Sequence, residues 1–166
     1  MHDHTSIVLS AGLPVQDELH TYIYGIMKET QEPDKLGLLE EFLIKMDDEL
    51  IDAICRAAKQ FCIEFMDEIS DEWREEIEQK MTVQVNEDTP PQEMLKCFYC
   101  ALIVDAPEDS SRIGYQLSGN CDWEEEHGIE IDILDGKLVY LSEYSGQSPW
   151  DDHSDEEWNY AAHIYE

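Results

Sequence analysis

The chain has 166 residues, of which 42% are hydrophobic, and its 40 acidic residues against 10 lysines and arginines give a formal net charge of −30. A chain of this length and composition folds as a globular protein and can bury a core without disulfides or metals. The charge repels nucleic acid phosphates and anionic membrane surfaces, which argues against both as partners. It attracts cations and basic proteins and speeds their approach.

Cysteine usage and the N-terminal sequence indicate the compartment. The chain has five cysteines, an odd number. Its N-terminus lacks the basic and apolar regions of a signal peptide, and it contains no apolar run of about 18 residues that could span a membrane. We therefore expect a cytoplasmic protein with reduced thiols.

Helical periodicity dominates the N-terminal half. Apolar residues recur three and four positions apart within residues 15–30, 33–46 and 47–68, which predicts a helix in each. The third prediction is the clearest, because an unbroken stripe from Leu50 to Phe65 is flanked by Cys55 and Cys62. A fourth helix is predicted to begin after Ser70, a favoured N-cap residue, and to run to Met81.

The pattern changes at Pro90 and Pro91, which cannot continue a helix. They mark a boundary between a helical part, 1–88, and a β part, 89–166, within what we expect to be one compact unit. "RIGYQLSGNC" alternates as a strand does, whereas "CFYCALIV" is compatible with a buried strand or a helix end. The predicted fold class is α+β, with an N-terminal helical part followed by a small antiparallel sheet.

Asp135 and Gly136 predict a tight hairpin, because a type I′ turn needs positive φ at both central positions. In the register set by this turn, Ile133 faces Leu138 and Ile131 faces Tyr140, and directly opposed residues share a face. The first face is expected to be buried and carries Ile129, Ile131, Ile133, Leu138 and Tyr140. The other face is expected to be mostly wet and carries Glu130, Asp132, Lys137, Val139 and Leu141.

A zinc site is one interpretation of the cysteines, because Cys97, Cys100, Cys121 and His127 offer four ligands of suitable type. The second pair is spaced Cys-x5-His rather than as a tight knuckle. If residues 97–104 form a strand, Cys97 and Cys100 point to opposite faces. The Cys-x-x-Cys spacing also lacks the turn chemistry of a thioredoxin-like motif. We favour buried packing of the thiols and expect no metal and no cofactor.

An enzyme is a second interpretation, because Glu124, Glu125, Glu126 and His127 are candidates for an acid–base pair. Neighbouring residues of a loop point in different directions, however, and the chain has no glycine-rich phosphate loop and no nucleophile elbow. We predict no catalytic residues. We predict instead a structural corner in which Gly128 permits the turn, Trp123 caps the sheet core with its indole N–H on a polar partner, and a carboxylate holds His127. Its members are Cys121, Trp123, Glu126, His127 and Gly128.

The run from Cys121 to Gly128, followed by two strands joined at Asp135-Gly136, resembles a family of small acidic bacterial domains. Many members of that family are similar to immunity proteins encoded beside toxins. The resemblance covers the region near 112–146 and leaves the helical half uncovered. It implies a protein that binds a toxin domain, and it carries over no catalytic residues.

Charge and resemblance converge on an immunity or antitoxin-like protein that binds and occludes a basic toxin domain, with a nuclease as the expected example. The alternatives are an enzyme using Glu126 and His127, and an acidic regulatory module for another basic protein. From Leu117 to Glu166 the chain has fourteen acidic residues and one basic residue, Lys137, so we expect the partner there. The predicted surface comprises Glu124, Glu125, Asp151, Asp152, Asp155, Glu156 and Glu157, with Trp150 and Trp158 as aromatic anchors.

Overall fold

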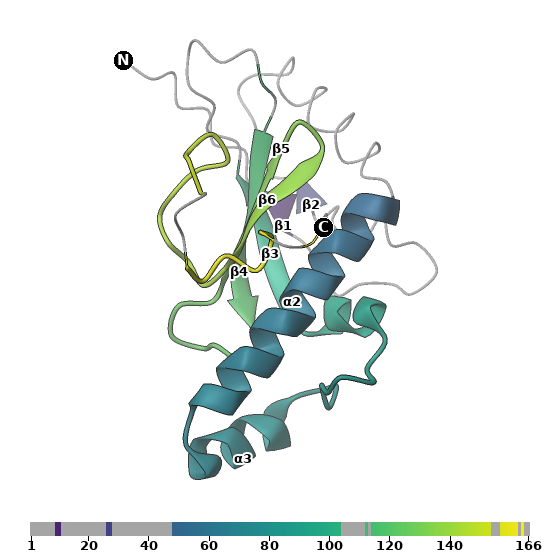
Figure 1. Ribbon diagram of the computed structural model, residues 1–166, viewed down its shortest axis with the longest axis vertical. Helices are drawn as coiled ribbons and strands as arrows, with labels where there is room; N and C mark the ends of the chain where they lie inside the picture. The colour runs from purple at the N-terminus through teal and green to yellow at the C-terminus, as the bar shows by residue number, and fades with distance from the viewer. Residues whose placement is uncertain are drawn as a thin grey trace.

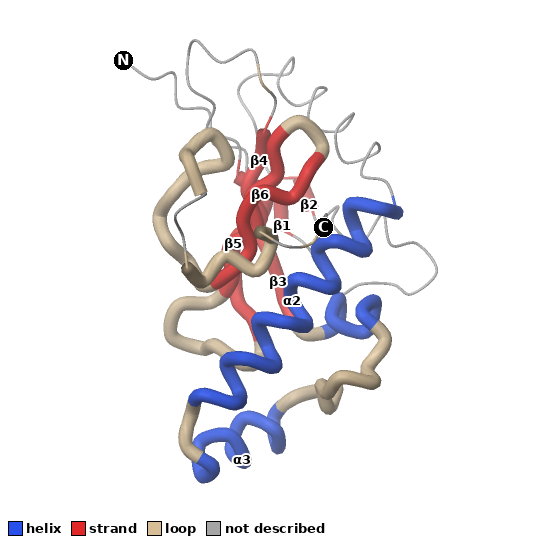
Figure 2. Tube along the Cα trace, viewed as in Figure 1, coloured by secondary structure: helices blue, strands red, loops and turns tan. Residues whose placement is uncertain are grey.

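The computed structural model describes residues 9–10, 26–27, 48–103, 112, 114–153, 157–162 and 164. They form an α+β fold, as the sequence predicts (Figure 1, Figure 2). In chain order the elements are β1 (Leu9–Ser10), β2 (Ile26–Met27), α2 (Asp48–Glu68), α3 (Asp71–Lys80), the 3-10 helix η1 (Pro91–Lys96), β3 (Phe98–Ile103), β4 (Gly114–Cys121), β5 (Ile129–Leu134) and β6 (Lys137–Ser142).

One antiparallel sheet holds the strands in the order β2-β1-β3-β4-β5-β6. Helix α2 runs obliquely beside this sheet, and α3 folds back at its C-terminal end (Figure 1). Apolar side chains from α2, from η1 and from the sheet form a single core cluster. Fully buried members include Ile51, Ile54, Leu95, Phe98 and Ile131. The helical residues and the strand residues therefore stabilise one another across the Pro90-Pro91 break.

The two described α-helices confirm the strongest helical predictions. Helix α2 buries the predicted stripe from Leu50 to Phe61, together with Cys55 and Cys62 beside it, and leaves Phe65 partly buried. Helix α3 begins after Ser70, whose Oγ accepts the backbone N–H of Trp73 at 3.3 Å, as an N-cap residue should. Acidic residues in its first turn and Lys80 in its last turn match the helix dipole.

The helix predicted over 15–30 is wrong at Ile26 and Met27, which form β2. These residues pair with Ser10 and Leu9 of β1, and β1 in turn pairs with β3. Local periodicity cannot predict such pairing, because the partner strands are distant in sequence. The remainder of that predicted helix, and the helix predicted over 33–46, lie outside the described residues.

The strand predicted at "RIGYQLSGNC" corresponds to β4, and "CFYCALIV", which was compatible with a buried strand or a helix end, contains β3. Cys97 precedes β3 and terminates η1 instead of lying in the strand. Its backbone N–H donates to Met94 O at 2.9 Å. The earlier inference that Cys97 and Cys100 alternate along one strand is therefore wrong for Cys97.

The tight hairpin is confirmed, because φ is 52° at Asp135 and 77° at Gly136. Ile133 pairs with Leu138 as predicted, but the predicted pairing of Ile131 with Tyr140 is wrong. A register shift lies between Asp132 and Ile133, so that Asp132 pairs with Tyr140 and Ile131 with Leu141. This β-bulge exchanges the two faces of the later part of β6. It places Leu141 in the core cluster and Tyr140 on the opposite side.

The second face of the hairpin is buried, contrary to the prediction that it is mostly wet. Glu130 and Asp132 are both 0% exposed. Residues 143–153 lie across them, with hydrogen bonds from Ser145 and Gly146 to Glu130 and with His153 against Tyr140, ring centroids 5.0 Å apart. Alternation in the sequence predicts which side chains are polar, but a covering segment can satisfy polar groups as well as water does.

None of the helices in the described part of the chain is both long and apolar enough to cross a bilayer.

Candidate functional site

Glu124 organises the turn of residues 121–128, which we call the acid corner. Its Oε1 accepts the backbone N–H groups of Glu126 at 3.0 Å and His127 at 3.2 Å. Its Oε2 lies 3.1 Å from His127 Nδ1. Only 5% of the surface of Glu124 is exposed. Its carboxylate stabilises the turn through charge-assisted hydrogen bonds from backbone donors.

The glutamate that supports the corner is not the one that the sequence predicted. Glu126 was predicted to brace the turn with its side chain, but it is exposed and enters the network through its backbone N–H. Glu124 was predicted to offer its charge to a partner, but its burial places it inside the corner. Three consecutive glutamates look alike in sequence, and only the backbone path of the turn distinguishes them.

Trp123 and Gly128 anchor the corner to the rest of the fold. Trp123 is fully buried and meets Phe61 edge to face, with ring centroids 5.4 Å apart. Among the residues that the structure describes, its Nε1 has no hydrogen-bond partner, so the expected polar contact of the indole is not formed there. Gly128 has φ +71°, and a Cβ there would lie 2.1 Å from Gly119 O. Only glycine fits this position, as the sequence predicts.

His127 lies between two carboxylates at the surface. Glu143 Oε2 is 3.5 Å from His127 Nδ1, in addition to the contact with Glu124. The hydrogen bond and the charge of Glu124 raise the pKa of His127 above its usual value, and the charges of Glu143 and Glu126 add to the shift. The imidazole therefore holds its proton more tightly, and in its protonated form it links the corner to Glu143.

Metal binding has one geometric candidate among the described side chains. Ligand atoms of Glu124, His127 and Glu143 all lie within 4.8 Å of one another. Two carboxylates and one imidazole suit a divalent transition metal, although proton and metal compete for His127. Of the zinc set that was considered as an alternative from the sequence, the described members Cys97 and Cys121 are buried, whereas His127 is exposed and contacts Glu124. The Cys100 side chain lies outside the described part.

The buried thiols are protonated at neutral pH. Burial is the main cause that raises the pKa values of Cys97 and Cys121 to about 12 each. Burial also raises the pKa of Cys62, to which nearby Cys97 and Cys121 contribute. A thiol of this kind is a poor nucleophile and a poor metal ligand, because both roles need the thiolate.

A groove of about 200 Å³ lies between α2 and residues 157–162, and we call it the aromatic groove. Its lining residues are aromatic or acidic apart from one serine. They are Phe61, Phe65, Glu68, Ser142, Glu143, Trp158 and Tyr160. Phe61 stacks on Tyr160 with ring centroids 5.2 Å apart, whereas Trp158 is 52% exposed. The groove thus extends from the buried rings of the core to the exposed indole of Trp158.

Negative charge surrounds one end of this groove. Burial raises the pKa of Tyr160, and the next causes are the charge of Glu64 and the hydrogen bond to it. The charges of Glu68 and Glu143 add to the same shift. Three carboxylates therefore raise the pKa of one hydroxyl, and none of the described lining residues of the groove is basic.

Glu130 and Asp132 form a buried carboxyl pair on the second face of the sheet. Glu130 accepts hydrogen bonds from the backbone N–H groups of Ser145 and Gly146 and from the Ser145 hydroxyl. Asp132 accepts one from Gln116 Nε2 at 2.8 Å. Burial, followed by the hydrogen bond and charge of Glu130, raises the pKa of Asp132 to about 9. Asp132 is therefore the member that holds a proton at neutral pH.

The predicted partner surface is only partly assembled in space. Trp150 is half-buried, and its Nε1 donates to Arg112 O at 3.1 Å. This hydrogen bond connects the 143–153 segment to Arg112. It lines a different hollow from Trp158. Glu125, Asp151, Asp152, Glu157 and Trp158 are exposed. Asp155 and Glu156 lie outside the described residues.

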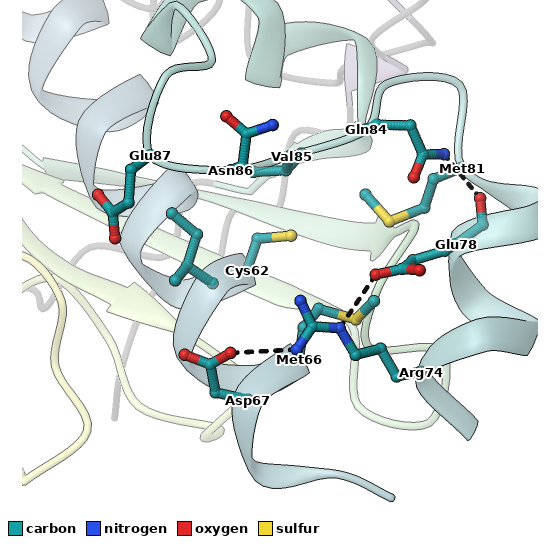
Figure 3. A pocket seen from close by; sticks show the side chains of 11 residues that line it. Cys62, Met66, Asp67, Arg74, Glu78, Met81, Gln84, Val85, Asn86 and Glu87 are labelled. Carbon is teal, nitrogen blue, oxygen red and sulfur yellow. Dashed lines mark hydrogen bonds and ion pairs between the residues drawn. The ribbon is translucent and has the colours of Figure 1, made fainter. Parts of the chain in front are cut away.

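A further hollow, of about 230 Å³, lies between α2, α3 and residues 81–87 (Figure 3). Arg74 lies between two carboxylates there, with Nη1 3.2 Å from Asp67 and Nε 3.0 Å from Glu78. Cys62 also lines it. Because Arg74 is already neutralised and the thiol is protonated, these side chains do not form an anion site or a nucleophile.

Comparison with known proteins yields one match. A family model described as Domain of unknown function (DUF6985) matches residues 17–148. The chain belongs to the DUF6985 family. No curated protein and no solved structure matches it. The DUF6985 match includes the acid corner, the carboxyl pair and Glu143, and it ends before Trp158 and Tyr160.

Sequence reasoning did not identify the aromatic groove of this DUF6985 protein. Phe65 belongs to the apolar stripe of α2 and was interpreted as core, yet it is only partly buried. Glu143 follows the last strand and carries no local signal of its own. A contiguous cue did exist, since Trp158 and Tyr160 stand in an acidic segment that is rich in aromatic residues.

Proposed function

We propose that the chain is a non-catalytic, cytoplasmic binding protein of the immunity type, which covers the basic surface of a toxin domain. The observation that carries this proposal is the surplus of exposed carboxylates in the β half. From Leu117 to Glu166 the one lysine or arginine is Lys137. The described acidic residues of that stretch that are exposed are Glu125, Glu126, Asp135, Glu143, Asp151, Asp152 and Glu157.

The exposed acids differ in their surroundings from the buried acids of the same stretch. Glu124, Glu130 and Asp132 are buried and hydrogen-bonded, so they contribute to the fold. The exposed ones remain accessible to a partner and give the surface a strong negative potential. Such a potential accelerates encounter with a basic protein and pairs with lysines and arginines that otherwise bind phosphate.

A toxin as the partner is supported by the resemblance of residues 112–146 to immunity proteins. A non-catalytic role is supported by the chemistry of the candidate groups. His127 Nδ1 is engaged by the carboxylates of Glu124 and Glu143. Burial raises the pKa values of Cys97 and Cys121 to about 12, so these thiols are poor nucleophiles at neutral pH.

The test is a kinetic measurement with the protein encoded by the neighbouring open reading frame, prepared as an inactive toxin variant. Asp152→Lys and Glu157→Lys should slow association about tenfold at low salt and flatten its salt dependence, because exposed charges act mainly on the on-rate. Glu76→Lys is the matched control, since Glu76 is exposed on α3 and the change in net charge is the same. Equal association rates for all variants, or no complex with the toxin, would overturn the proposal.

A further inference from the structure

We propose that the aromatic groove binds the guanidinium group of an arginine side chain, presented by the protein partner. The inference rests on the proposed function for the identity of that partner, whereas the chemistry of the groove stands on the contacts of its own residues.

The rings of the groove offer a face to a cation. Trp158 is half exposed, and Phe65 is partly buried at the same groove. Phe65 also meets Trp73 with ring centroids 5.9 Å apart, and Trp73 is 41% exposed, so the aromatic surface extends onto α3. A cation over an aromatic face is stabilised by the ring quadrupole, and Trp is the strongest partner of this kind.

The carboxylates of the groove come from two elements that meet there. Glu68 is the last residue of α2, and Glu143 directly follows β6. His127 contacts one oxygen of Glu143 from the acid corner. A guanidinium group has five donors in a planar fork, so it can bond carboxylates on both sides of the groove while it lies flat on a ring.

The end of α2 supplies an independent reason for a cation at this place. The C-terminus of a helix carries a partial negative charge and is normally matched by basic residues in the last turn. Helix α2 has 21 residues, no basic residue in its last turn, and Asp67 and Glu68 at its end. Arg74 pairs with Asp67, whereas Glu68 lines the groove. An arginine from a partner would neutralise the helix end and Glu68 together.

The probe for this site is the peptide acetyl-Gly-Gly-Arg-Gly-Gly-amide, titrated into the full chain. The four tryptophan indole N–H signals in a nitrogen–proton NMR spectrum report the position of binding. Trp158→Phe assigns the Trp158 signal and retains a ring in the groove. We expect the largest shift at Trp158, and at least about tenfold weaker binding of the same peptide with citrulline, which has the shape of arginine without its charge.

Matched variants separate the groove from the general negative field. Glu68→Gln and Glu143→Gln should each weaken arginine peptide binding several-fold, whereas Glu76→Gln on α3, with the same change in charge, should not. Trp158→Ala should abolish binding of the arginine peptide in the groove, and Trp158→Phe should retain part of that binding. Equal binding of the arginine and citrulline peptides would overturn the inference, as would equal weakening by Glu143→Gln and Glu76→Gln.

The two proposals fail in different ways. If the toxin binds but Trp158→Ala leaves its dissociation rate unchanged, the groove is not the anchor and the immunity-type function remains. If the arginine peptide binds in the groove but the toxin does not bind the chain, the proposed function is wrong and the chemistry of the groove remains.

Discussion

Asp132→Asn is expected to make the protein less sensitive to pH. Asp132 and Glu130 are both 0% exposed, and two negative charges cannot share that site without a large electrostatic cost. Glu130 receives the hydrogen bonds of Ser145 and Gly146, so the proton of the pair resides on Asp132. Asparagine has the shape of a protonated aspartic acid and keeps a donor for Glu130 and an acceptor for Gln116.

The size of the effect follows from proton linkage. Burial, and after it the hydrogen bond and charge of Glu130, raise the pKa of Asp132 to about 9 from its ordinary value of 3.8. A folded-state pKa above the unfolded value means that folding takes up a proton. The associated stability is complete below pH 3.8 and is lost as the pH rises through about 9. Within this window the free energy of unfolding falls by up to about 1.4 kcal/mol per pH unit for one whole proton.

Urea unfolding followed by tryptophan fluorescence, at pH 5, 6, 7 and 8, measures this difference directly. Groups that are far from Asp132 contribute equally in both proteins, so the gap between the parent and Asp132→Asn reports on Asp132 and on its contact with His153, whose Nε2 lies 3.7 Å from Asp132 Oδ2. The gap should widen with pH in favour of the variant. Glu130→Gln is the matched control and should destabilise at every pH by about 2 kcal/mol, since it removes hydrogen bonds to a charged acceptor. Parallel pH curves for the parent and Asp132→Asn would show that Asp132 is ionised.

The remaining predictions concern the acid corner and the thiols. Gly128→Ala should lower the free energy of unfolding by at least about 2 kcal/mol in urea titrations, because of its positive φ and the close approach of Gly119 O; a change within about 0.5 kcal/mol, typical of a surface substitution, would contradict the tight turn. Glu124→Gln should lower the pKa of His127 in an NMR titration, since Glu124 is the main cause of its rise. Glu126→Ala should leave stability nearly unchanged. A larger fall in the pKa of His127 for Glu126→Ala than for Glu124→Gln would show that Glu126 supports the turn. Cys97 and Cys121 should resist iodoacetamide at pH 8 in the native protein and react after unfolding, as read by peptide mass mapping, because their pKa values of about 12 leave little thiolate. Rapid native modification of both would show that the corner opens.

Local signals in the sequence were sufficient for α2, α3 and the hairpin. The stripe of α2, the Ser70 cap and the Asp135-Gly136 turn each depend on residues close in the chain, and each is found where predicted. Such features can be predicted because the same few residues form the interaction and carry the signal.

Features that depend on a distant segment were not predicted. The burial of Glu130 requires the 143–153 segment to lie over the sheet, and alternation cannot reveal that cover. The bulge in β6 changes the face of Tyr140 without a glycine to mark it. Likewise, Ile26 belongs to an apolar pattern with helical spacing in the sequence, but it pairs with Ser10 in the sheet.

The candidate site shows the same division. Trp158 and the exposed acids Glu125 and Glu157 were recognised from composition and are exposed in the structure. The position of Trp158 beside Phe65 and Glu143 depends on how residues 157–162 lie beside α2. The sequence therefore suggested the chemistry of a basic partner, and the fold supplied the groove in which an arginine can be tested.

The most direct test of immunity-type binding is a titration of toxin activity. The toxin encoded by the neighbouring open reading frame is held at fixed concentration, and its activity is measured as the purified chain is added. We predict complete loss of activity at an equimolar ratio at low salt, with the midpoint moving to higher chain concentration as salt is raised, because the attraction between exposed charges is screened. Full toxin activity in a large excess of the chain at low salt would contradict the proposed function.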